Sequence, residues 1–497
     1  MRYSFALQIL TTSLGLIALS ACTDLEVKEK DSILVKSGSG GFQSVNVSEA
    51  LQSAYKDLGA YTDQANIYAL GEHPTAEMIP PTRGVDWGDN GVWRTLDQHT
   101  WDATHSWILN AWNQLNQRVF KCTQILASSP TPAQAAEAKF LRAWNMYHVM
   151  DYWGQVPFRE VTEGVNDNPK VKTRAEAFDF IVKDLTEALP ALPEAKPAQA
   201  ENSLATKAAA NYLLAKLFLN KAVFKAAKPE GPYTFDKADM DQVVKYVDAI
   251  TAAGFKLSSS YFTNFTATAK DEIIFTSPEG TPQNRWYMTL HYNQNPSGWN
   301  GFATLADFYD TFEAKDIRKG VPAKPDGKAY SGIGRGFLIG QQYDDSGKEI
   351  VDDRSKKPLQ FTRDVTLSGT PTDKGIRVIK YHPADAGKYI LMRYGDAFLM
   401  KAEALLRAGN NAEAIKLVNE MRASRGASTI ATVNENTVFE EIGRETYWEG
   451  NKRTVEIRFN KFLTGTGVDK KDPYTVLYPI PSDAITSNPN LKQNEGY

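Results

Sequence analysis

Two alanine-rich helices joined by a glycine limit the possible folds of this chain more than any other segment. Ala402-Glu403-Ala404-Leu405-Leu406 runs to Gly409, and Ala412-Glu413-Ala414-Ile415 then leads to Met421. Small side chains let two antiparallel helices approach closely, and a glycine closes the turn between them. This spacing is typical of a tetratricopeptide hairpin. We therefore expect a scaffold of helical repeats.

Apolar residues at helical spacing occupy much of the remaining chain. Ser48 is the expected cap of a first helix. The alternative to a repeat scaffold is an irregular helical bundle, because the other helix pairs match the tetratricopeptide pattern more loosely. Further helices are predicted over 101–126, 133–152, 173–189, 206–226, 236–253, 389–408, 412–425 and 437–462.

Two segments lack helical periodicity. Residues 71–98 are rich in Gly, Pro, Asp and Trp, which predicts a long surface loop, and loops of that length are usually functional. Residues 255–388 contain many turns and brief strand-like runs at 272–276 and 376–381. The predicted fold is mainly α: helical repeats at about 45–253 and 389–462 carry an irregular, minor-β lobe at about 255–388.

The N-terminal 44 residues have the pattern of an exported lipoprotein. Arg2 precedes a short apolar run that ends in Leu19-Ser20-Ala21-Cys22. The run is too short for a comfortable membrane span and is typical of a signal peptide. We predict a signal peptide over 1–21, acylation of Cys22 to anchor the exported protein to a membrane, a flexible linker to residue 44, and a single domain over 45–497. An ordinary secretory signal is the alternative.

Composition excludes some classes of function. A net charge of −3 disfavours nucleic acid, which needs an excess of Lys and Arg. The six histidines form no metal-ligand pair, and no nucleophile or phosphate-binding motif occurs. We therefore predict no metal and no cofactor. Carboxylates are plentiful, so counting residues leaves a glycosidase pair open, although no catalytic residues can be nominated. If Cys22 carries lipid, Cys122 has no disulfide partner and packs in the core.

Three segments carry a resemblance to a known family. They are Ala138-Lys139-Phe140-Leu141-Arg142-Ala143-Trp144 continuing to Tyr152-Trp153-Gly154-Gln155-Val156-Pro157; Arg444-Glu445-Thr446-Tyr447-Trp448-Glu449-Gly450 with Arg453 and Arg458; and Tyr478-Pro479-Ile480-Pro481 followed by Asn488-Pro489-Asn490-Leu491 and Gln493-Asn494-Glu495-Gly496-Tyr497. With the leader and repeat helices, they resemble the SusD/RagB-like family of Bacteroidetes outer-membrane lipoproteins across essentially the whole mature chain.

The resemblance implies a non-catalytic glycan-binding protein on the cell exterior. Its implied partners are an oligosaccharide or polysaccharide, outer-membrane lipid, and a SusC-like TonB-dependent transporter beneath it. Three charged residues of these motifs, Arg142, Glu445 and Glu449, lie on predicted helices, where buried ion pairs can fix helix register. Asp316 and Arg318 look like the family's D-x-R element and are expected to form a structural pair.

Aromatic residues in the irregular segments are the candidate ligand contacts. Flat rings with a polar handle suit sugars, which present apolar C–H faces beside hydroxyls. In related proteins the binding surface comes from an early loop and a segment just past mid-chain. We expect at least two of the four tryptophans to face the ligand. The candidates are Arg83, Trp87, Trp93, Trp286, Tyr292, Trp299 and Asn300.

Other interpretations of these residues stay open. Each ring in the irregular segments could instead anchor its loop to the body. The tryptophans at 101, 107, 112, 144 and 153 have core-like placement. A surface glycoside hydrolase, a lid that contacts only the transporter, and uptake of peptides or glycopeptides are the competing functions.

Overall fold

The computed structural model describes residues 44–160, 163, 167–278, 284–464 and 472–497. These residues belong to one compact unit, 34–497. The predicted signal peptide, Cys22 and the linker up to residue 43 lie outside the described residues. Within the described ranges, no helix combines the length and apolar character needed to cross a membrane.

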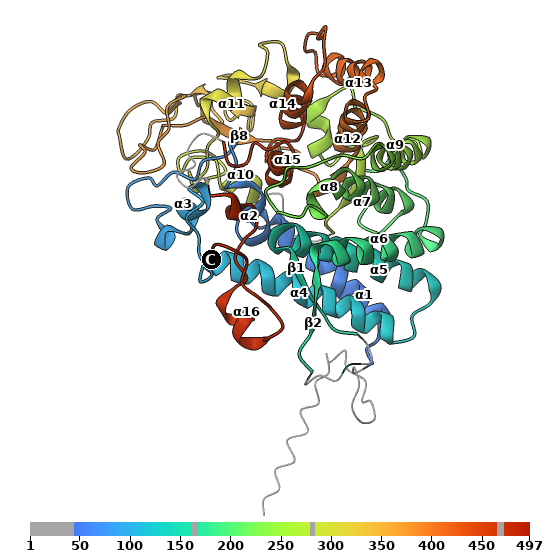
Figure 1. The fold of residues 1–497 in the computed structure, drawn as a ribbon. Coiled ribbons are helices and arrows are strands. Elements are labelled where there is room, and N and C mark those ends of the chain that lie inside the picture. Colours follow the sequence, from blue (N-terminus) through green and yellow to red (C-terminus); the bar gives the residue numbers. More distant parts are fainter. Residues whose placement is uncertain (1–43, 161–162, 164–166, 279–283, 465–471) are drawn as a thin grey trace, which may run out of the picture. The chain divides into compact units, whose positions relative to one another are not determined.

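Helices dominate the unit, as the sequence predicted (Figure 1). Neighbouring helices pack in succession: α5 contacts α4 and α6, α7 contacts α9, and α12 contacts both α9 and α13. The helices are α1 Val47–Lys56, α2 Asn66–Glu72, α3 Val92–Asp97, α4 Ser106–Ala127, α5 Pro132–Trp153, α6 Arg174–Ala188, α7 Lys207–Leu219, α8 Lys221–Phe224, α9 Lys237–Ala252, α10 Asn284–Tyr287, α11 Ala306–Asp310, α12 Tyr394–Arg407, α13 Asn411–Ser424, α14 Glu435–Thr446, α15 Lys452–Arg458 and α16 Ser482–Ser487.

The tetratricopeptide-like hairpin near the C-terminal end is present. Helices α12 and α13 pack together, and Gly409 between them has a φ of +80°, a left-handed conformation that favours glycine. Helices α6 and α7 pair more loosely, since α6 packs chiefly on α5, and α7 on α9.

Short strands occur within the irregular lobe, which consists mostly of turns and coil. Strand β3 pairs with β9, β5 lies between β4 and β8, β6 pairs with β7, and β1 pairs with β2 outside the lobe; every pair is antiparallel. The strands are β1 Gln155–Phe158, β2 Lys170–Thr173, β3 Ile273–Thr276, β4 Gly320–Val321, β5 Arg335–Leu338, β6 Gly340–Gln341, β7 Gln360–Phe361, β8 Arg377–Ile379 and β9 Ile390–Arg393.

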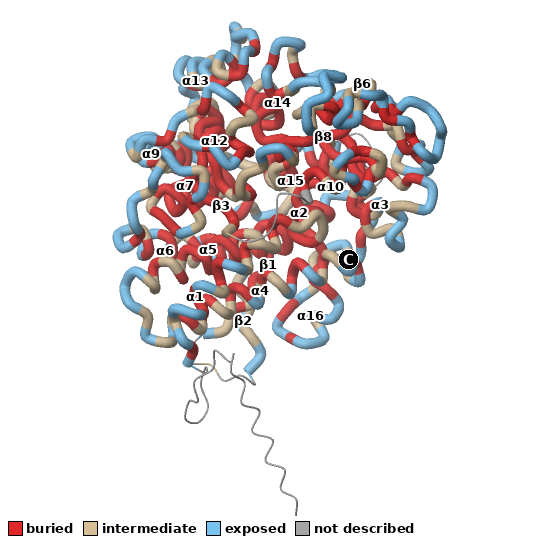
Figure 2. The backbone as a smooth tube through the Cα atoms, turned by 180° about the vertical axis from the view of Figure 1, so that it is seen from behind, coloured by how far each residue is buried: buried red, intermediate tan, exposed pale blue. Residues whose placement is uncertain are grey.

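The core follows the helix stack and continues under the lobe (Figure 2). Trp101, Trp112, Trp144 and Trp153 are buried, which confirms their predicted core role, whereas Trp107 is half-buried. Cys122 is buried on α4 and unpaired. Burial raises the pKa of its thiol to about 12, so the group stays neutral.

Several predicted helix boundaries were wrong because tertiary contacts override local propensity. The first helix is capped by Asn46, not Ser48: the Asn46 carboxamide accepts hydrogen bonds from the backbone N–H groups of Ser48 and Glu49. The segment 389–408 is split, because Ile390–Arg393 pairs with β3 as strand β9 and the helix begins at Tyr394.

Two other predicted helices are interrupted. The segment 206–226 breaks at Asn220 into α7 and α8. The segment 437–462 breaks between α14 and α15, where Trp448 and Gly450 adopt φ values of +58° and +82°. A left-handed conformation at two nearby residues ends a right-handed helix. The predicted helix 101–126 begins later, at Ser106.

The segment 71–98 is not a surface loop over its whole length. Glu72, His73 and Glu77 are fully or almost fully buried, and Val92–Asp97 forms helix α3. The segment returns to the surface mainly around residues 84–90. Its first half is therefore part of the core, and this anchoring fixes where the exposed half lies.

A buried cluster of charges joins the lobe to the helices. Glu445 on α14 accepts hydrogen bonds from Arg393 at 2.7 Å, from Arg425 at 2.8 Å and from Arg318 at 3.2 Å. Arg318 also pairs with Asp316 at 2.7 Å, as predicted. Burial raises the pKa of Glu445, but the guanidiniums of Arg425 and Arg393 outweigh it and hold that pKa well below its usual value.

The other motif charges are also paired inside the protein. Arg142 on α5 forms a two-pronged contact with Asp184 on α6, with distances of 2.7 and 2.8 Å. The Glu449 carboxylate forms ion pairs with Arg393 and Lys380. These contacts confirm the predicted structural role, since buried charges of opposite sign that are fully hydrogen-bonded fix how their elements meet.

Replacing Glu445 by alanine is expected to lower the free energy of unfolding by about 3–5 kcal/mol, because it leaves three buried guanidiniums without their shared carboxylate. Glu440→Ala is the matched control, since Glu440 lies on the same helix with a side chain 40% exposed and pairs with Arg444 at 3.5 Å. The control is expected to cost about 1 kcal/mol or less.

Chemical denaturation of both variants measures the difference. If the alanine variant does not fold, Glu445→Gln replaces it, because glutamine keeps the side-chain shape and part of the hydrogen bonding. Its loss of unfolding free energy is expected to lie between those of Glu445→Ala and Glu440→Ala. Equal stability of the Glu445 and Glu440 variants would show that the cluster does not hold the lobe to the helices.

Candidate functional site

The two irregular segments that carry the candidate aromatic residues lie side by side. Ile79 and Ala303 form an isolated antiparallel bridge, with backbone N–H to carbonyl distances of 2.9 and 3.1 Å. Both views place α3 next to α10 (Figures 1 and 2). Side chains more than 200 positions apart are thereby brought onto one surface.

Three rings form what we call the aromatic platform: Trp87, Tyr287 and Trp299. Tyr287 and Trp299 stack with their ring centroids 5.8 Å apart and their planes 23° apart. Trp87 lies 6.5 Å from Trp299 with an interplanar angle of 48°. Trp299 is 42% exposed, and the other two rings are half-buried. The platform is therefore curved and open to solvent.

Backbone contacts fix the platform rings in place. The indole Nε1 of Trp87 donates a hydrogen bond to the carbonyl oxygen of Trp299 at 2.9 Å. Gly301 has to be a glycine, because an added Cβ would lie 2.3 Å from the Trp87 ring. Rings held by hydrogen bonds and close packing lose little freedom on binding, which favours affinity.

The other two nominated tryptophans lie beneath the surface. Trp93 is 3% exposed, packs 3.7 Å from Trp107 between ring centroids, and donates from Nε1 to Asp89 at 2.7 Å. Trp286 is 7% exposed and precedes Tyr287 on α10. Neither presents a ring face to solvent. Trp93 supports Trp87, since their centroids are 5.5 Å apart.

A polar group of three side chains, Asp86, Tyr292 and Arg354, lies beside the platform, because Asp86 directly precedes Trp87 in the chain. The Tyr292 hydroxyl donates to Asp86 at 2.6 Å, and Arg354 pairs with the same carboxylate oxygen at 2.7 Å. The Arg354 guanidinium also lies 4.5 Å over the Tyr292 ring. Sequence patterns alone did not indicate Arg354, because it belongs to a separate turn and only the fold brings it to Asp86.

These contacts set the charge state of the polar group. Partial burial opposes ionisation of Asp86, but hydrogen bonds from Tyr292 and Arg354 hold its pKa below the usual value. Burial and the hydrogen bond to Asp86 raise the pKa of Tyr292 to about 12. At neutral pH the group therefore presents a carboxylate, a guanidinium and a neutral phenol.

Arg83 and Asn300 are buried among backbone carbonyls. Arg83 is 1% exposed and donates to the Pro371 carbonyl at 2.6 Å. Asn300 is fully buried, donates to the Thr372 carbonyl at 3.0 Å and accepts from Arg377 at 2.7 Å. Both side chains hold the segments under the platform in this structure.

Buried carboxyl groups anchor the start of the segment that carries Trp87. Glu77 accepts a hydrogen bond from the backbone N–H of Trp448 at 2.9 Å and lies 3.4 Å from Lys452. Glu456 on α15 accepts from the N–H of Ala76 at 3.1 Å. Burial raises the pKa of Glu456 to about 8, against the attraction of Lys452. Glu456 is therefore protonated at neutral pH.

This raised pKa predicts a pH-dependent stability. Folded protein keeps the Glu456 proton up to a pH of about 8, whereas the unfolded chain releases it above about 4.5. The folded state binds more protons in that window, so the Glu456 contribution to stability falls as pH rises through it. Glu456→Gln is expected to raise the melting temperature, and to raise it more at pH 8 than at pH 5.

Thermal unfolding of wild type and Glu456→Gln over that range measures the effect. Glu440→Gln is the matched control and is expected to shift the melting temperature little at any pH. A difference between wild type and Glu456→Gln that does not change with pH would contradict the raised pKa.

Metal ligation finds no support in the part of the chain that the structure describes: no three His, Cys, Asp or Glu side chains there are grouped to hold an ion. The arrangement around the platform is one of open rings beside fixed hydrogen-bonding groups. Such a surface can hold a ligand that has both apolar faces and hydroxyls.

Comparison with known proteins identifies the family to which this mainly helical chain belongs. Residues 25–219 match a family model described as starch-binding and associating with the outer membrane, and residues 268–471 match the model of the SusD family. Together the two models cover most of the chain. The chain belongs to the SusD family.

Individual relatives agree with this assignment. The starch-binding protein SusD of Bacteroides thetaiotaomicron is 27% identical, over 76% of this chain and 75% of the relative. A SusD-like protein of Formosa agariphila, P2, is 23% identical over 97% of this chain and 98% of the relative.

Solved structures share the fold. A SusD-like protein from Bacteroides fragilis superposes with a TM-score of 0.68 at 20% identity, covering 91% of this chain and 96% of the other. A structure described as a laminarin-binding SusD-like protein gives a TM-score of 0.65 at 16% identity, with 91% and 99% covered.

Proposed function

We propose that this protein binds an extracellular glycan at the cell surface without altering it and delivers it to a SusC-like TonB-dependent transporter. The observation that carries the proposal is the meeting of Trp87, Tyr287 and Trp299 on an open surface. Relatives named for binding starch and laminarin support a carbohydrate ligand.

The physical basis of binding is ring stacking assisted by hydrogen bonds. A pyranose ring has an apolar C–H face that can lie on the exposed indole of Trp299. Its hydroxyls can then exchange hydrogen bonds with the Asp86 carboxylate and the Arg354 guanidinium, which are charged and already oriented. Because both groups are fixed before binding, little ordering is needed.

The properties of Asp86, the carboxylate next to Trp87 in sequence, fit a non-catalytic role. A glycosidase needs one carboxyl group with a raised pKa to protonate the leaving oxygen. The pKa of Asp86 is lowered instead, by its partners Tyr292 and Arg354. Asp86 is therefore suited to accept hydrogen bonds and unsuited to donate a proton.

The proposal places the protein on the outer leaflet, anchored through lipid on Cys22. It rests here on the leader sequence and on the family description as associating with the outer membrane. Peptide or glycopeptide uptake and a lid that contacts only the transporter are the competing proposals, and both predict that the platform rings are dispensable for glycan binding.

Trp299→Ala is expected to weaken glycan binding at least about tenfold, equivalent to about 1.4 kcal/mol. The loss follows from removing the most exposed ring of the platform. Affinity electrophoresis and calorimetry with starch and laminarin oligosaccharides measure it. Tyr246→Ala is the matched control, since this half-buried ring lies on scaffold helix α9.

Unchanged affinity of the Trp299 variant would refute the platform as the binding surface. The same protein and glycan mixtures also separate binding from catalysis. No new reducing ends are expected in them, and their appearance, proportional to protein concentration, would favour the glycoside hydrolase.

A further inference from the structure

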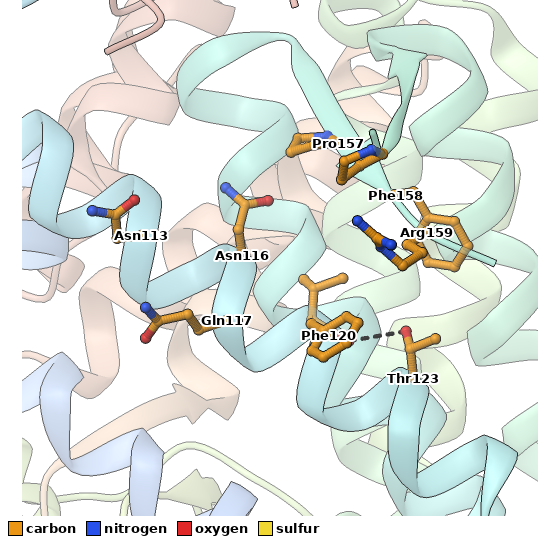
Figure 3. Close-up of a pocket in the computed structure, with 10 residues that line it drawn as sticks. Asn113, Asn116, Gln117, Phe120, Thr123, Pro157, Phe158 and Arg159 are labelled. Carbon is orange, nitrogen blue, oxygen red and sulfur yellow. Dashed lines mark hydrogen bonds between the residues drawn. The ribbon is translucent and has the colours of Figure 1, made fainter. Parts of the chain in front are cut away.

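A second concave site lies away from the platform, between helix α4 and the segment that contains β1 (Figure 3). Its cavity has a volume of about 350 Å³. This value falls at the lower end of the range of about 300–1,000 Å³ for small-molecule sites. The lining residues are Asn113, Asn116, Gln117, Val119, Phe120, Thr123, Pro157, Phe158, Arg159 and Pro169.

One wall of this cavity is a row of carboxamides. Asn113, Asn116 and Gln117 are three and four positions apart on α4, which puts them on the same helix face. The exposed amides of Asn113 and Gln117 make no hydrogen bond with any described residue. Each can both donate and accept, which suits a ligand with several hydroxyls.

Asn116 carries an unmet hydrogen-bonding requirement. Its Nδ2 donates to the Trp112 carbonyl at 2.9 Å, while its Oδ1 is buried and has no partner among the described residues. A buried acceptor without a donor costs about 1–3 kcal/mol. Because Asn116 lines the cavity, a ligand hydroxyl would satisfy this oxygen once its side chain turns toward the open space.

The remaining lining supplies apolar surface and a fixed charge. Half-buried Phe120 and Pro157 offer faces for C–H groups, and Arg159 adds a guanidinium opposite the carboxamides. Among the described residues, no carboxylate lines the cavity. The groove therefore differs in chemistry from the platform, since its polar lining is mainly carboxamide and the two share no residue.

We propose that this cavity, the α4 groove, is a second carbohydrate site that holds a short stretch of pyranose rings. The carboxamides and Arg159 pair with ring hydroxyls, and Phe120 and Pro157 contact the C–H faces. The inference rests on the proposed function, because it assigns the same class of ligand. A polysaccharide that engages both sites gains avidity, which can exceed either single affinity by roughly 10²–10⁴-fold.

Calorimetric titration of the full-length protein with short starch and laminarin oligosaccharides tests the groove. Wild type is expected to show two binding events. Trp87→Ala/Trp299→Ala is expected to keep the groove event, and Asn113→Ala/Gln117→Ala to keep only the platform event. Asn110→Ala is the matched control, because Asn110 is an exposed carboxamide on α4 that does not line the groove.

Retention in gels containing the intact polysaccharide gives a second readout. The groove variant is expected to bind at least about tenfold more weakly than Asn110→Ala, through lost avidity. If Trp87→Ala/Trp299→Ala binds no oligosaccharide while wild type does, or if the groove variant matches Asn110→Ala in both assays, the groove is refuted and the platform stands. Absence of glycan binding by wild type would refute both proposals.

Discussion

The arrangement of the lobe and the helices depends on the ion pairs that three arginines form with the buried carboxylate of Glu445. This carboxylate draws together Arg318 from the lobe, Arg393 from the end of β9 and Arg425 from the end of α13. Each of these groups is costly to bury alone and stable only with its partners. The lobe can therefore settle on the helices in one register, the one that satisfies all of them.

The position of the aromatic platform follows from this fixed register. The segment before Trp87 is tied to the turn between α14 and α15, where Glu77 accepts from the Trp448 N–H. The segment before Trp299 belongs to the lobe, and the two meet at the bridge between Ile79 and Ala303. The rings thus lie on a surface that the helices hold rigid, although none of the three rings belongs to a long helix.

Sequence patterns predicted the scaffold because helices are encoded locally. The alanine spacing around Gly409 and the apolar spacing of the long helices depend on residues a few positions apart. The strand at Ile390–Arg393 was predicted as helix, since its four residues suit either structure and only pairing with β3, more than a hundred residues earlier, decides between them. Distant contacts also occur at the helix breaks near Trp448 and Asn220: the Trp448 N–H donates to Glu77, and Arg458 donates to Asn220.

The site was predictable as a region and not residue by residue. Trp87 and Trp93 occur in the same kind of sequence, yet Trp93 is buried by Trp107 and Phe302, whereas Trp87 stays at the surface. Arg354 reaches Asp86 only through the fold, since the two are far apart in sequence and no local pattern encodes their contact.

We propose that exposed indole rings, held by a rigid helical scaffold, bind the carbohydrate. A crystal structure of the protein with starch or laminarin oligosaccharides would show where the sugar lies. We expect a pyranose ring stacked on the Trp299 indole, with further sugar contacts at Trp87 or Tyr287. Sugar bound elsewhere while the Trp299 ring remains uncovered would refute the proposal.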